Sequence, residues 1–449
     1  MCIQMHTFSL TVHSINDPST NDLINYNLRT NNPIMSINTS QKHYLAGKRI
    51  IVTGAGIAGM AFARALDQNW PSEHPKPEIV MYERSSKILK PGHEGYTMSI
   101  KKESGLQALD RIGLLDAALS SSTVGSNGIQ QLPTIWANDW RPMLDFKDSP
   151  PTQDRIPATG IRIVRHVLRQ ILVDGLPFDT KVHWEKGCDS VEVLEGGKVR
   201  VNLSNGSSDE CDLLVTADGV NSNVRSALLP DDVLNYAGAI CCQGTSKFPS
   251  GKPALLEKKW GINISGSGVA FLNFPVDSTT GPWALTYKSD QPRERIRGKE
   301  AVERKKELLN EIRQRGKMFR EPFGEFIEAT DPETLQVFSA EQKLPIVHSQ
   351  RLPKASVVFI GDANSSKSPF SGSGANTALM DAVDLATQIS KSTSIRAAID
   401  SFDAESVPRS QKAIKRGLWT IMLLHVDGFA FWLLRVFLAA VSFMLRFRR

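Results

Sequence analysis

The sequence predicts an α/β fold in which a discontinuous Rossmann-type domain carries an inserted β-sheet domain. Two glycine motifs predict the Rossmann part. The first is Gly54-Ala-Gly56-Ile-Ala-Gly59, and the second covers 361–376; each follows a short apolar run and leads into an apolar-periodic segment. Between them lie short apolar runs separated by turn residues, which are typical of a β-sheet.

Composition excludes several classes of protein. The 449 residues suffice for two or three domains or one discontinuous pair. The net charge is +6, but the basic residues are spread out and not interleaved with aromatic ones, so we expect no nucleic-acid partner. The five cysteines form no CxxC pair and no zinc spacing, which predicts no metal site and suits a reducing, cytoplasmic compartment.

The chain divides into segments of different character. Residues 1–44 are rich in Asn, Ser and Thr, lack periodicity and lack a signal peptide, so we expect a disordered extension in which Met35 is an alternative start. The remaining predicted segments are a Rossmann-type domain over 45–230 and 346–417, an inserted domain over 231–345 and a hydrophobic tail over 418–449.

The first glycine motif lies in a predicted βαβ unit, with a strand over Arg49–Thr53, a helix over Ile57–Gln68 and a strand over Ile79–Glu83. Further predicted elements are an amphipathic helix over Lys101–Leu119, a helix over Ile161–Val173, a meander over Val182–Val215, a charged helix over 299–315 and a helix over Ala375–Ile389.

The three glycines of the first motif answer three physical needs. Gly54 permits a tight turn, Gly56 lets the backbone approach a pyrophosphate, and Gly59 lets the helix lie against the strand. The helix N-terminus supplies free N–H groups for the phosphates. Glu83 ends the next strand, where a carboxylate hydrogen-bonds a ribose diol, so we expect FAD or NAD and not a 2′-phosphate.

A short-chain dehydrogenase is the rival interpretation of this motif. That family needs a Tyr-xxx-Lys sequence well downstream of the glycines. The one such pair here, Tyr44 and Lys48, precedes the first strand, so we reject this alternative.

The second glycine motif supplies the other end of the same site. Asp362 follows an apolar strand and can accept a hydrogen bond from a ribityl hydroxyl, although it could also simply cap a turn. Gly374, Ala375 and Asn376 begin a helix whose N–H groups would face a flavin ring. The two motifs together therefore point to FAD.

These motifs, in this order, resemble the class A flavoprotein monooxygenases, the para-hydroxybenzoate hydroxylase-like family. The resemblance covers most of residues 47–417. Besides the two glycine motifs and Glu83, it includes Gly95-Tyr-Thr-Met-Ser-Ile, Arg165-His-Val-Leu168 and Asp218-Gly219 running to Arg225.

The resemblance implies roles for residues across the chain. Glu83 would bind the adenosine ribose, Gly95 and Arg165 would lie against the cofactor, Asp218 would serve the FAD and nicotinamide pyrophosphates, and Asp362 would hold the ribityl chain. NAD(P)H would be the co-substrate that reduces the flavin, which then reacts with oxygen while the protein orients the substrate and excludes water.

The chain departs from the family pattern in two places. Asn364-Ser365 stands where the family usually has a small residue and a histidine. The 231–345 region offers no matching substrate-side acid, base or tyrosine, so no catalytic residue is assigned. His166, His183 and His348 are isolated and are interpreted as structural or surface residues.

The tail over 418–449 is apolar and ends in arginines. Asp427 and Arg435 interrupt it, so a docked helix, an interfacial anchor and a true membrane span remain as alternatives. We expect it to hold the protein at the cytosolic face of a membrane without building the flavin site.

The sequence therefore predicts an FAD-dependent, NAD(P)H-consuming monooxygenase that hydroxylates or epoxidises an apolar or aromatic small molecule. Two alternatives remain on the same fold: a flavin-dependent reductase or oxidase without oxygen insertion, and a non-catalytic flavoprotein.

Overall fold

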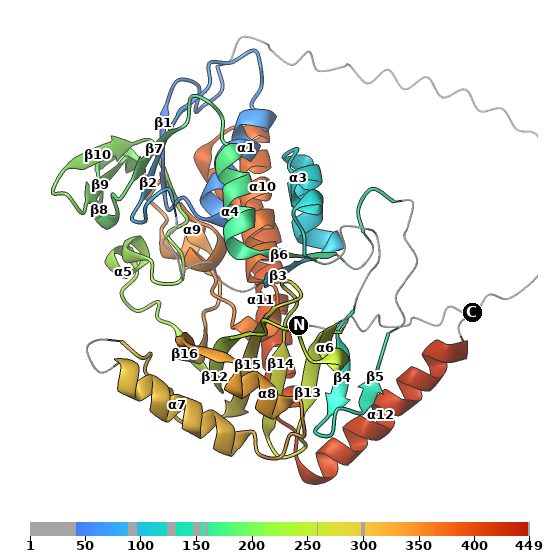
Figure 1. Cartoon of the computed structure of the whole chain (residues 1–449). Helices are drawn as coiled ribbons and strands as arrows, with labels where there is room; N and C mark the ends of the chain where they lie inside the picture. The colour runs from blue at the N-terminus through green and yellow to red at the C-terminus, as the bar shows by residue number, and fades with distance from the viewer. Residues whose placement is uncertain are drawn as a thin grey trace, which may run out of the picture.

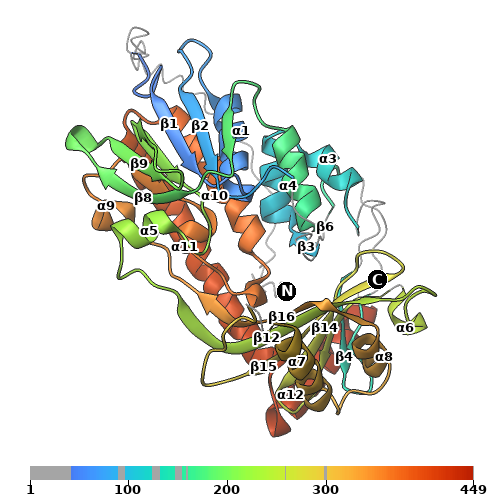
Figure 2. The ribbon, with the colours of Figure 1, turned by 60° about the vertical axis from the view of Figure 1, so that its left-hand side comes forward.

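The computed structural model describes residues 42–88, 97–123, 132–146, 154–157, 160–257, 259–297 and 301–447. Two sheet-containing halves lie one above the other, and the long helix α11 (Ile395–Leu424) runs between them (Figure 1). Figure 2 shows the same halves from the side, with the seven-stranded sheet below the parallel one.

The upper half is built on a parallel sheet. Its strand order is β17 (Val357–Phe359), β11 (Leu213–Thr216), β1 (Arg49–Thr53), β2 (Glu78–Glu83) and β7 (Lys181–Trp184). Every neighbouring pair is parallel, so all five carboxyl ends lie at one edge. A three-stranded antiparallel sheet of β8 (Cys188–Val193), β9 (Val199–Leu203) and β10 (Ser208–Cys211) adjoins it. The predicted α/β fold with a Rossmann-type domain is confirmed.

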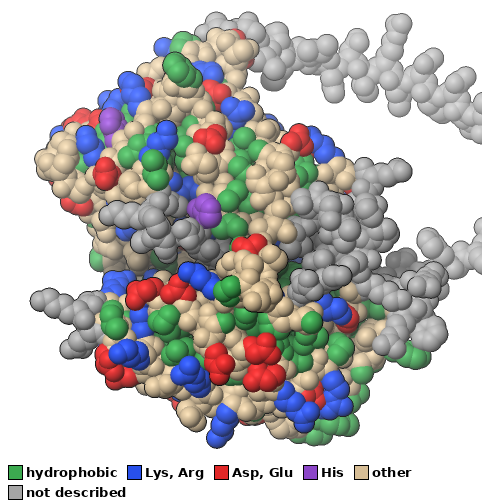
Figure 3. All heavy atoms as spheres, in the orientation of Figure 1, with side chains coloured by type: hydrophobic (Ala, Val, Ile, Leu, Met, Phe, Trp, Pro, Cys, Tyr) green, Lys and Arg blue, Asp and Glu red, His purple; other side chains and the backbone are tan. Residues whose placement is uncertain are grey.

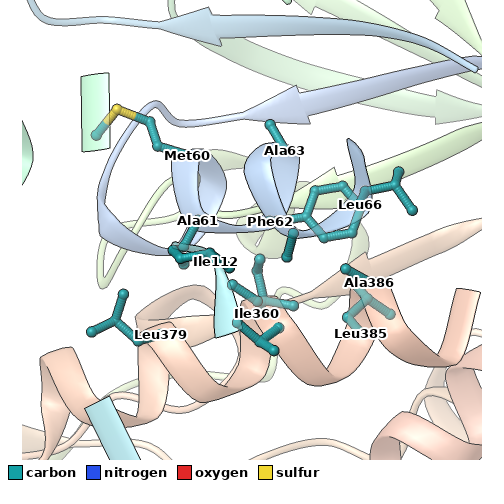
Figure 4. Packing of buried hydrophobic residues seen from close by; sticks show 14 of the residues in the cluster. Met60, Ala61, Phe62, Ala63, Leu66, Ile112, Ile360, Leu379, Leu385 and Ala386 are labelled. Carbon is teal, nitrogen blue, oxygen red and sulfur yellow. The ribbon is translucent and has the colours of Figure 1, made fainter. Parts of the chain in front are cut away.

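Helix α1 (Ile57–Asn69) packs against α10 (Gly374–Lys391), although the two are far apart in the sequence. Small side chains let the two helices approach closely, and the fully buried Phe62 fills the space between them (Figure 4). The same core includes Leu379 and Leu385 of α10. Burial of a ring such as that of Phe62 contributes about 1.5–3 kcal/mol to folding.

The lower half is a seven-stranded sheet that is antiparallel except where β13 meets β4. In spatial order its strands are β16 (Thr330–Gln342), β12 (Asn235–Lys247), β15 (Thr280–Lys288), β14 (Val269–Asn273), β13 (Gly261–Ile264), β4 (Thr134–Ala137) and β5 (Pro142–Leu144). Strands β4 and β5 come from the segment assigned above to the Rossmann-type domain, so the inserted sheet also recruits 134–144. The domain boundaries stay a proposal.

A two-stranded antiparallel sheet of β3 (Thr97–Ile100) and β6 (Ile161–Val164) belongs to neither large sheet. The remaining helices are η1 (Lys102–Leu106), α2 (Gln107–Arg111), α3 (Leu115–Ser120), α4 (Arg165–Asp174), η2 (Glu195–Gly197), α5 (Asn223–Leu228), α6 (Ala254–Glu257), α7 (Ala301–Arg315), α8 (Phe323–Glu328), α9 (His348–Arg351), η3 (Gly361–Ala363), η4 (Pro369–Ser371) and α12 (Gly428–Phe447).

Three predicted elements differ from the structure. The single helix over Lys101–Leu119 is divided. Elements η1 and α2 follow each other directly over 102–111, and the positive φ of Gly113 (+68°) then separates α2 from α3. The predicted helix over Ile161–Val173 begins as strand β6 and becomes helical only at Arg165. The meander over Val182–Val215 holds only for β8 to β10, because β7 and β11 join the parallel sheet.

Candidate functional site

Four of the predicted site residues follow four neighbouring strands of the parallel sheet. Asp362, Asp218, Gly54 and Glu83 stand at the carboxyl ends of β17, β11, β1 and β2, in that spatial order. Ligands of parallel α/β sheets bind at this edge. The sheet topology therefore brings together residues that lie far apart in the sequence.

The glycine turn after β1 is shaped by close backbone contacts. A Cβ on Gly54, whose φ is +96°, would lie 2.4 Å from the Ala217 carbonyl oxygen, and one on Gly59 would lie 2.1 Å from the Gly54 carbonyl oxygen. A Cβ on Gly56 would meet nothing within 4 Å. Gly54 and Gly59 are therefore needed by the fold, whereas Gly56 leaves open space beside the N-terminus of α1.

Glu83 is held by the backbone of the glycine turn. Its Oε2 accepts a hydrogen bond of 2.8 Å from the Ala55 N–H, and its Oε1 accepts one of 2.8 Å from the Ser85 N–H. Each carboxylate oxygen has two lone pairs, so both oxygens can also accept a hydroxyl. The carboxylate is thus fixed in position at the end of β2, and its oxygens can still accept further hydrogen bonds.

Asp218 and Asp362 each have a buried Oδ1 with no hydrogen-bond partner among the described residues. Burial raises the pKa of both carboxyls; for Asp362, the positive charges of Lys367, Arg165 and Arg225 act in the opposite direction. A buried acceptor without a donor is costly, so each oxygen suits a ligand hydroxyl.

Arg225 joins these two strand ends and was not predicted as a site residue. It donates from Nη1 to the Ala363 carbonyl (3.2 Å) and from Nη2 to the Val220 carbonyl (2.6 Å). Ser222 caps its helix by accepting from the Arg225 N–H at 3.0 Å. In the sequence, the Asp218-Gly219 motif that runs to Arg225 was the one pattern from which this role of Arg225 could have been predicted.

Helix α10 begins at Gly374, so the N–H groups of Gly374, Ala375 and Asn376 have no acceptor within the helix. The Asn376 side chain is used elsewhere: its Nδ2 donates to the Ser99 carbonyl (2.7 Å), and its Oδ1 accepts from the Lys101 N–H (2.8 Å). Asn376 thus fixes strand β3 beside the helix start, while its backbone N–H remains directed out of the helix end.

The other predicted residues lie in different surroundings. Arg165 is exposed at the start of α4, and Gly95 lies outside the described residues. Asn364 and Ser365, the departure from the family pattern, are buried. Asn364 Oδ1 accepts from the Ile346 N–H (3.2 Å) and Ser365 Oγ donates to the Lys343 carbonyl (3.2 Å), so both hold the loop in place.

His348 is a structural residue, as predicted. Its Nε2 accepts a 2.9 Å hydrogen bond from the Phe359 N–H, so the proton is on Nδ1, which donates to Asp403 Oδ1 at 2.7 Å. These bonds connect α9 and α11 to strand β17, and both nitrogens of the ring take part in them.

The arrangement fits FAD on four observations of this structure. These are the open space at Gly56, the fixed Glu83 carboxylate, the two partnerless aspartate oxygens and the free N–H groups of α10. No group of three or more His, Cys, Asp or Glu side chains that could hold a metal ion occurs among the described residues.

Comparison with known proteins decides the family. The family model of an FAD binding domain matches residues 297–417. Monooxygenase cfoF of Aspergillus candidus is 35% identical over 397 residues, which cover 86% of this chain and 93% of the relative. This chain belongs to the class A FAD-dependent monooxygenases.

More distant relatives agree with this family. The FAD-dependent monooxygenase nscC of Trichophyton rubrum is 26% identical over 417 residues, covering 84% of this chain and 94% of the relative. The structure of Klebsiella pneumoniae HpxO complexed with FAD and uric acid superposes with a TM-score of 0.70 at 21% identity, covering 89% of this chain and 94% of that one. At that identity the likeness concerns the fold.

The monooxygenase uses FAD as its cofactor and NAD(P)H as its co-substrate. When bound, FAD supplies the redox and oxygen chemistry that no side chain can perform.

Proposed function

We propose that the enzyme inserts one oxygen atom into an apolar or aromatic small molecule, by hydroxylation or epoxidation. The observation that supports this most is an apolar cluster to which Phe370 of η4, in the loop between Asp362 and α10, and Ile262 and Leu272 of the seven-stranded sheet all belong. A substrate that lies beside this apolar cluster would be kept away from water. Zeaxanthin epoxidase of Spinacia oleracea, 27% identical over 252 residues, is a relative whose name indicates such a substrate.

We also propose how the chain holds FAD. Gly56 and the start of α1 accept the pyrophosphate, and Glu83 binds the adenosine ribose. Asp362 binds the ribityl chain, Asp218 lies beside the pyrophosphate, and the α10 N–H groups face the flavin ring. The open geometry at Gly56 and the partnerless aspartate oxygens support these roles.

Labelled molecular oxygen tests the oxygen insertion. During NAD(P)H turnover with a library of aromatic and polyene compounds, the product should carry one labelled atom. NAD(P)H consumption with an oxidised but unlabelled product would favour a reductase or oxidase. A protein that binds FAD but consumes no NAD(P)H with any compound would favour the non-catalytic alternative.

The C-terminal helix supports a proposal about location. Among the described residues, one stretch is long and apolar enough to cross a membrane, Gly428–Leu445, and only 6% of it is buried. Leu438 is buried against the seven-stranded sheet, while Phe429, Trp432 and Phe443 are 72%, 56% and 62% exposed. Apolar side chains reach the surface over α12 at the lower right of Figure 3.

We propose that this outer face of α12 lies on a lipid surface, because the inner face already packs on the sheet and Arg435 on the same helix is exposed. A variant with Phe429, Trp432 and Phe443 changed to Ser should lose co-sedimentation with anionic lipid vesicles and keep its FAD. A control variant with the exposed Val233, Val302 and Leu344 changed to Ser should still bind. Concentration-dependent dimers without vesicle binding would instead indicate that a second copy covers the face.

Truncation after Gly417 is a poor test of the tail. Helix α11 continues to Leu424, and Ile421 and Leu424 are buried in the seven-stranded sheet's apolar cluster. The hydrophobic composition from Leu418 onward therefore belongs partly to the core, and point variants of α12 are the cleaner experiment.

A further inference from the structure

Lys101 brings a positive charge to the start of helix α10. The residue follows strand β3 directly and is half-buried. Its Nζ donates a hydrogen bond to Ser373 Oγ (3.2 Å), and Ser373 is the residue immediately before the helix. The lysine side chain therefore reaches from the end of β3 to the N-terminus of α10.

Asn376 fixes the backbone of Lys101 at the same place. Its Oδ1 accepts hydrogen bonds from the N–H of Lys101 (2.8 Å) and the N–H of Gly105 (3.3 Å). The same oxygen accepts from the Ser104 hydroxyl (3.1 Å), while the Nδ2 donates to the Ser99 carbonyl of β3 (2.7 Å). One side chain of α10 thus holds both strand β3 and helix η1, and with them Lys101, against the helix start.

The contact with Lys101 occupies the oxygen that would otherwise cap the helix. A serine in the position of Ser373 usually accepts a hydrogen bond from an N–H of the first helical turn. Here Ser373 Oγ accepts from Lys101 and donates to the Ser371 carbonyl (3.0 Å). Within the described residues, no side chain of Ser373 caps α10. The N–H groups of residues 374–376 therefore stay available to a ligand.

The helix dipole opposes a cation at this place. The aligned peptide groups of the 18-residue helix α10 create a partial positive charge at its N-terminus. Helix N-termini therefore favour acidic side chains and bound anions, and a lysine beside one is the unfavourable choice. The same arrangement stabilises any negative charge that is bound at the helix start, because the ammonium and the N–H groups then act in the same direction.

Reduction of the cofactor creates such a negative charge. NAD(P)H transfers a hydride and becomes NAD(P)⁺, while the flavin ring, which is neutral when oxidised, takes up two electrons and one proton. The ring therefore gains one negative charge. We infer that the Lys101 ammonium stabilises this charge and so raises the reduction potential of the enzyme. This inference rests on the proposed function, in which the N–H groups of α10 face the flavin ring.

Lys102 provides a matched control, because it carries the same charge one position further along the chain. Its Nζ pairs with Asp154 Oδ2 at 3.1 Å, and 67% of the Asp154 side chain is exposed. The Lys102 ammonium is thus directed to a surface carboxylate and not to α10. Loss of net charge or of local stability would affect variants of both lysines, whereas loss of charge at the helix start affects only those of Lys101.

The midpoint reduction potential of the FAD-loaded protein tests the inference, measured with a reference dye in the absence of oxygen and substrate. Lys101→Met should weaken the preference for the reduced cofactor roughly 5- to 30-fold, the effect of a charge at a partly buried helix end. For a two-electron couple, this change lowers the potential by about 20–45 mV. Lys101→Arg and Lys102→Met should retain the wild-type potential.

Two results of this experiment overturn the inference. One is a shift in Lys101→Met that is no larger than the shift in Lys102→Met. The other is an equal shift in Lys101→Arg, because the positive charge is then not what matters. If Lys101→Met does not retain FAD, Lys101→Gln takes its place, since glutamine keeps a donor for Ser373 Oγ and removes the charge.

The pH dependence of the wild-type potential is a second readout that needs no variant. A ring that stays anionic takes up one proton with two electrons, so the potential should change by about 30 mV per pH unit from pH 8 to about pH 5.5. A slope that becomes twice as steep between pH 7 and 5.5 overturns the inference, because the reduced ring is then neutral.

Turnover with labelled oxygen is measured separately from the potential, so the two proposals fail separately. A lowered potential in Lys101→Met together with unlabelled product from the wild-type enzyme contradicts only the oxygen insertion. Labelled product together with an unchanged potential in Lys101→Met contradicts only the role of Lys101.

Discussion

Replacement of Asp362 by Ala separates a cofactor ligand from a turn-shaping residue. The buried Oδ1 has no donor in the part of the chain that the structure describes, and burial raises the pKa of the carboxyl. A carboxyl whose pKa is raised by folding stabilises the fold at low pH, and this contribution is lost as the pH rises through the folded-state value. Above that value the carboxylate opposes folding of the FAD-free protein.

The expected magnitudes follow from that geometry. A hydrogen bond between a ribityl hydroxyl and a charged oxygen contributes about 1.5–3 kcal/mol. Loss of it should weaken FAD binding roughly 10- to 150-fold. The same substitution should leave the melting temperature of the FAD-free protein unchanged or higher, because it removes a buried oxygen that has no hydrogen-bond donor.

The assay is titration of FAD-free protein with FAD by fluorescence, together with its thermal unfolding. Asp381→Ala is the control, because Asp381 accepts from Gly361 N–H (3.0 Å), Ser406 Oγ (3.0 Å) and Arg409 Nη2 (2.8 Å) and should lower the melting temperature when removed. If Asp362→Ala lowers the melting temperature and leaves FAD affinity unchanged, Asp362 only shapes the turn.

Four further substitutions have distinct expected results. Gly56→Val should fold normally and purify without FAD, whereas Gly59→Val should not fold, because its Cβ meets a backbone oxygen; circular dichroism and flavin absorbance distinguish the two. His348→Phe should lower the free energy of unfolding by about 1–3 kcal/mol through the unsatisfied Phe359 N–H, with an unchanged flavin spectrum of the folded protein. Burial lowers the pKa of His425 to about 4. The free energy of unfolding should therefore fall by about 3 kcal/mol at most as the pH falls from 6.5 toward 4. Denaturant unfolding of His425→Gln should show a weaker pH dependence than that of the wild-type protein.

The sequence was sufficient for those parts of the fold that local patterns specify. The strand–glycine–helix signal at Gly54 and the apolar run before Asp362 each carry their own periodicity. Elements β1, α1 and α10 were therefore predicted close to their bounds, and a strand was predicted before Asp362, where β17 lies. The helix over Lys101–Leu119 was wrong because a single glycine conformation at Gly113 overrode a continuous amphipathic pattern.

Contacts between distant segments could not be predicted. Arg225 bridges two strand ends, and Arg162 of β6 lies over the ring of Trp260, which precedes β13 in the lower half. Neither contact leaves a local pattern, since each depends on which elements the topology places side by side. The same reason explains β4 and β5, which join the lower sheet by pairing with β13, a strand far along the chain. The roles assigned to the cofactor-binding residues stay predictions.

The pairing of α1 with α10 has a consequence for synthesis of the protein. While the ribosome is still producing the middle of the chain, the face of α1 that carries Phe62 has no partner, because α10 emerges much later. At roughly 5–20 residues per second, this interval is on the order of 15–65 s. During it, the nascent chain exposes apolar surface that chaperones can bind, and it lacks the helix start that we propose to face the flavin ring. Production in a foreign host should therefore depend on chaperone supply.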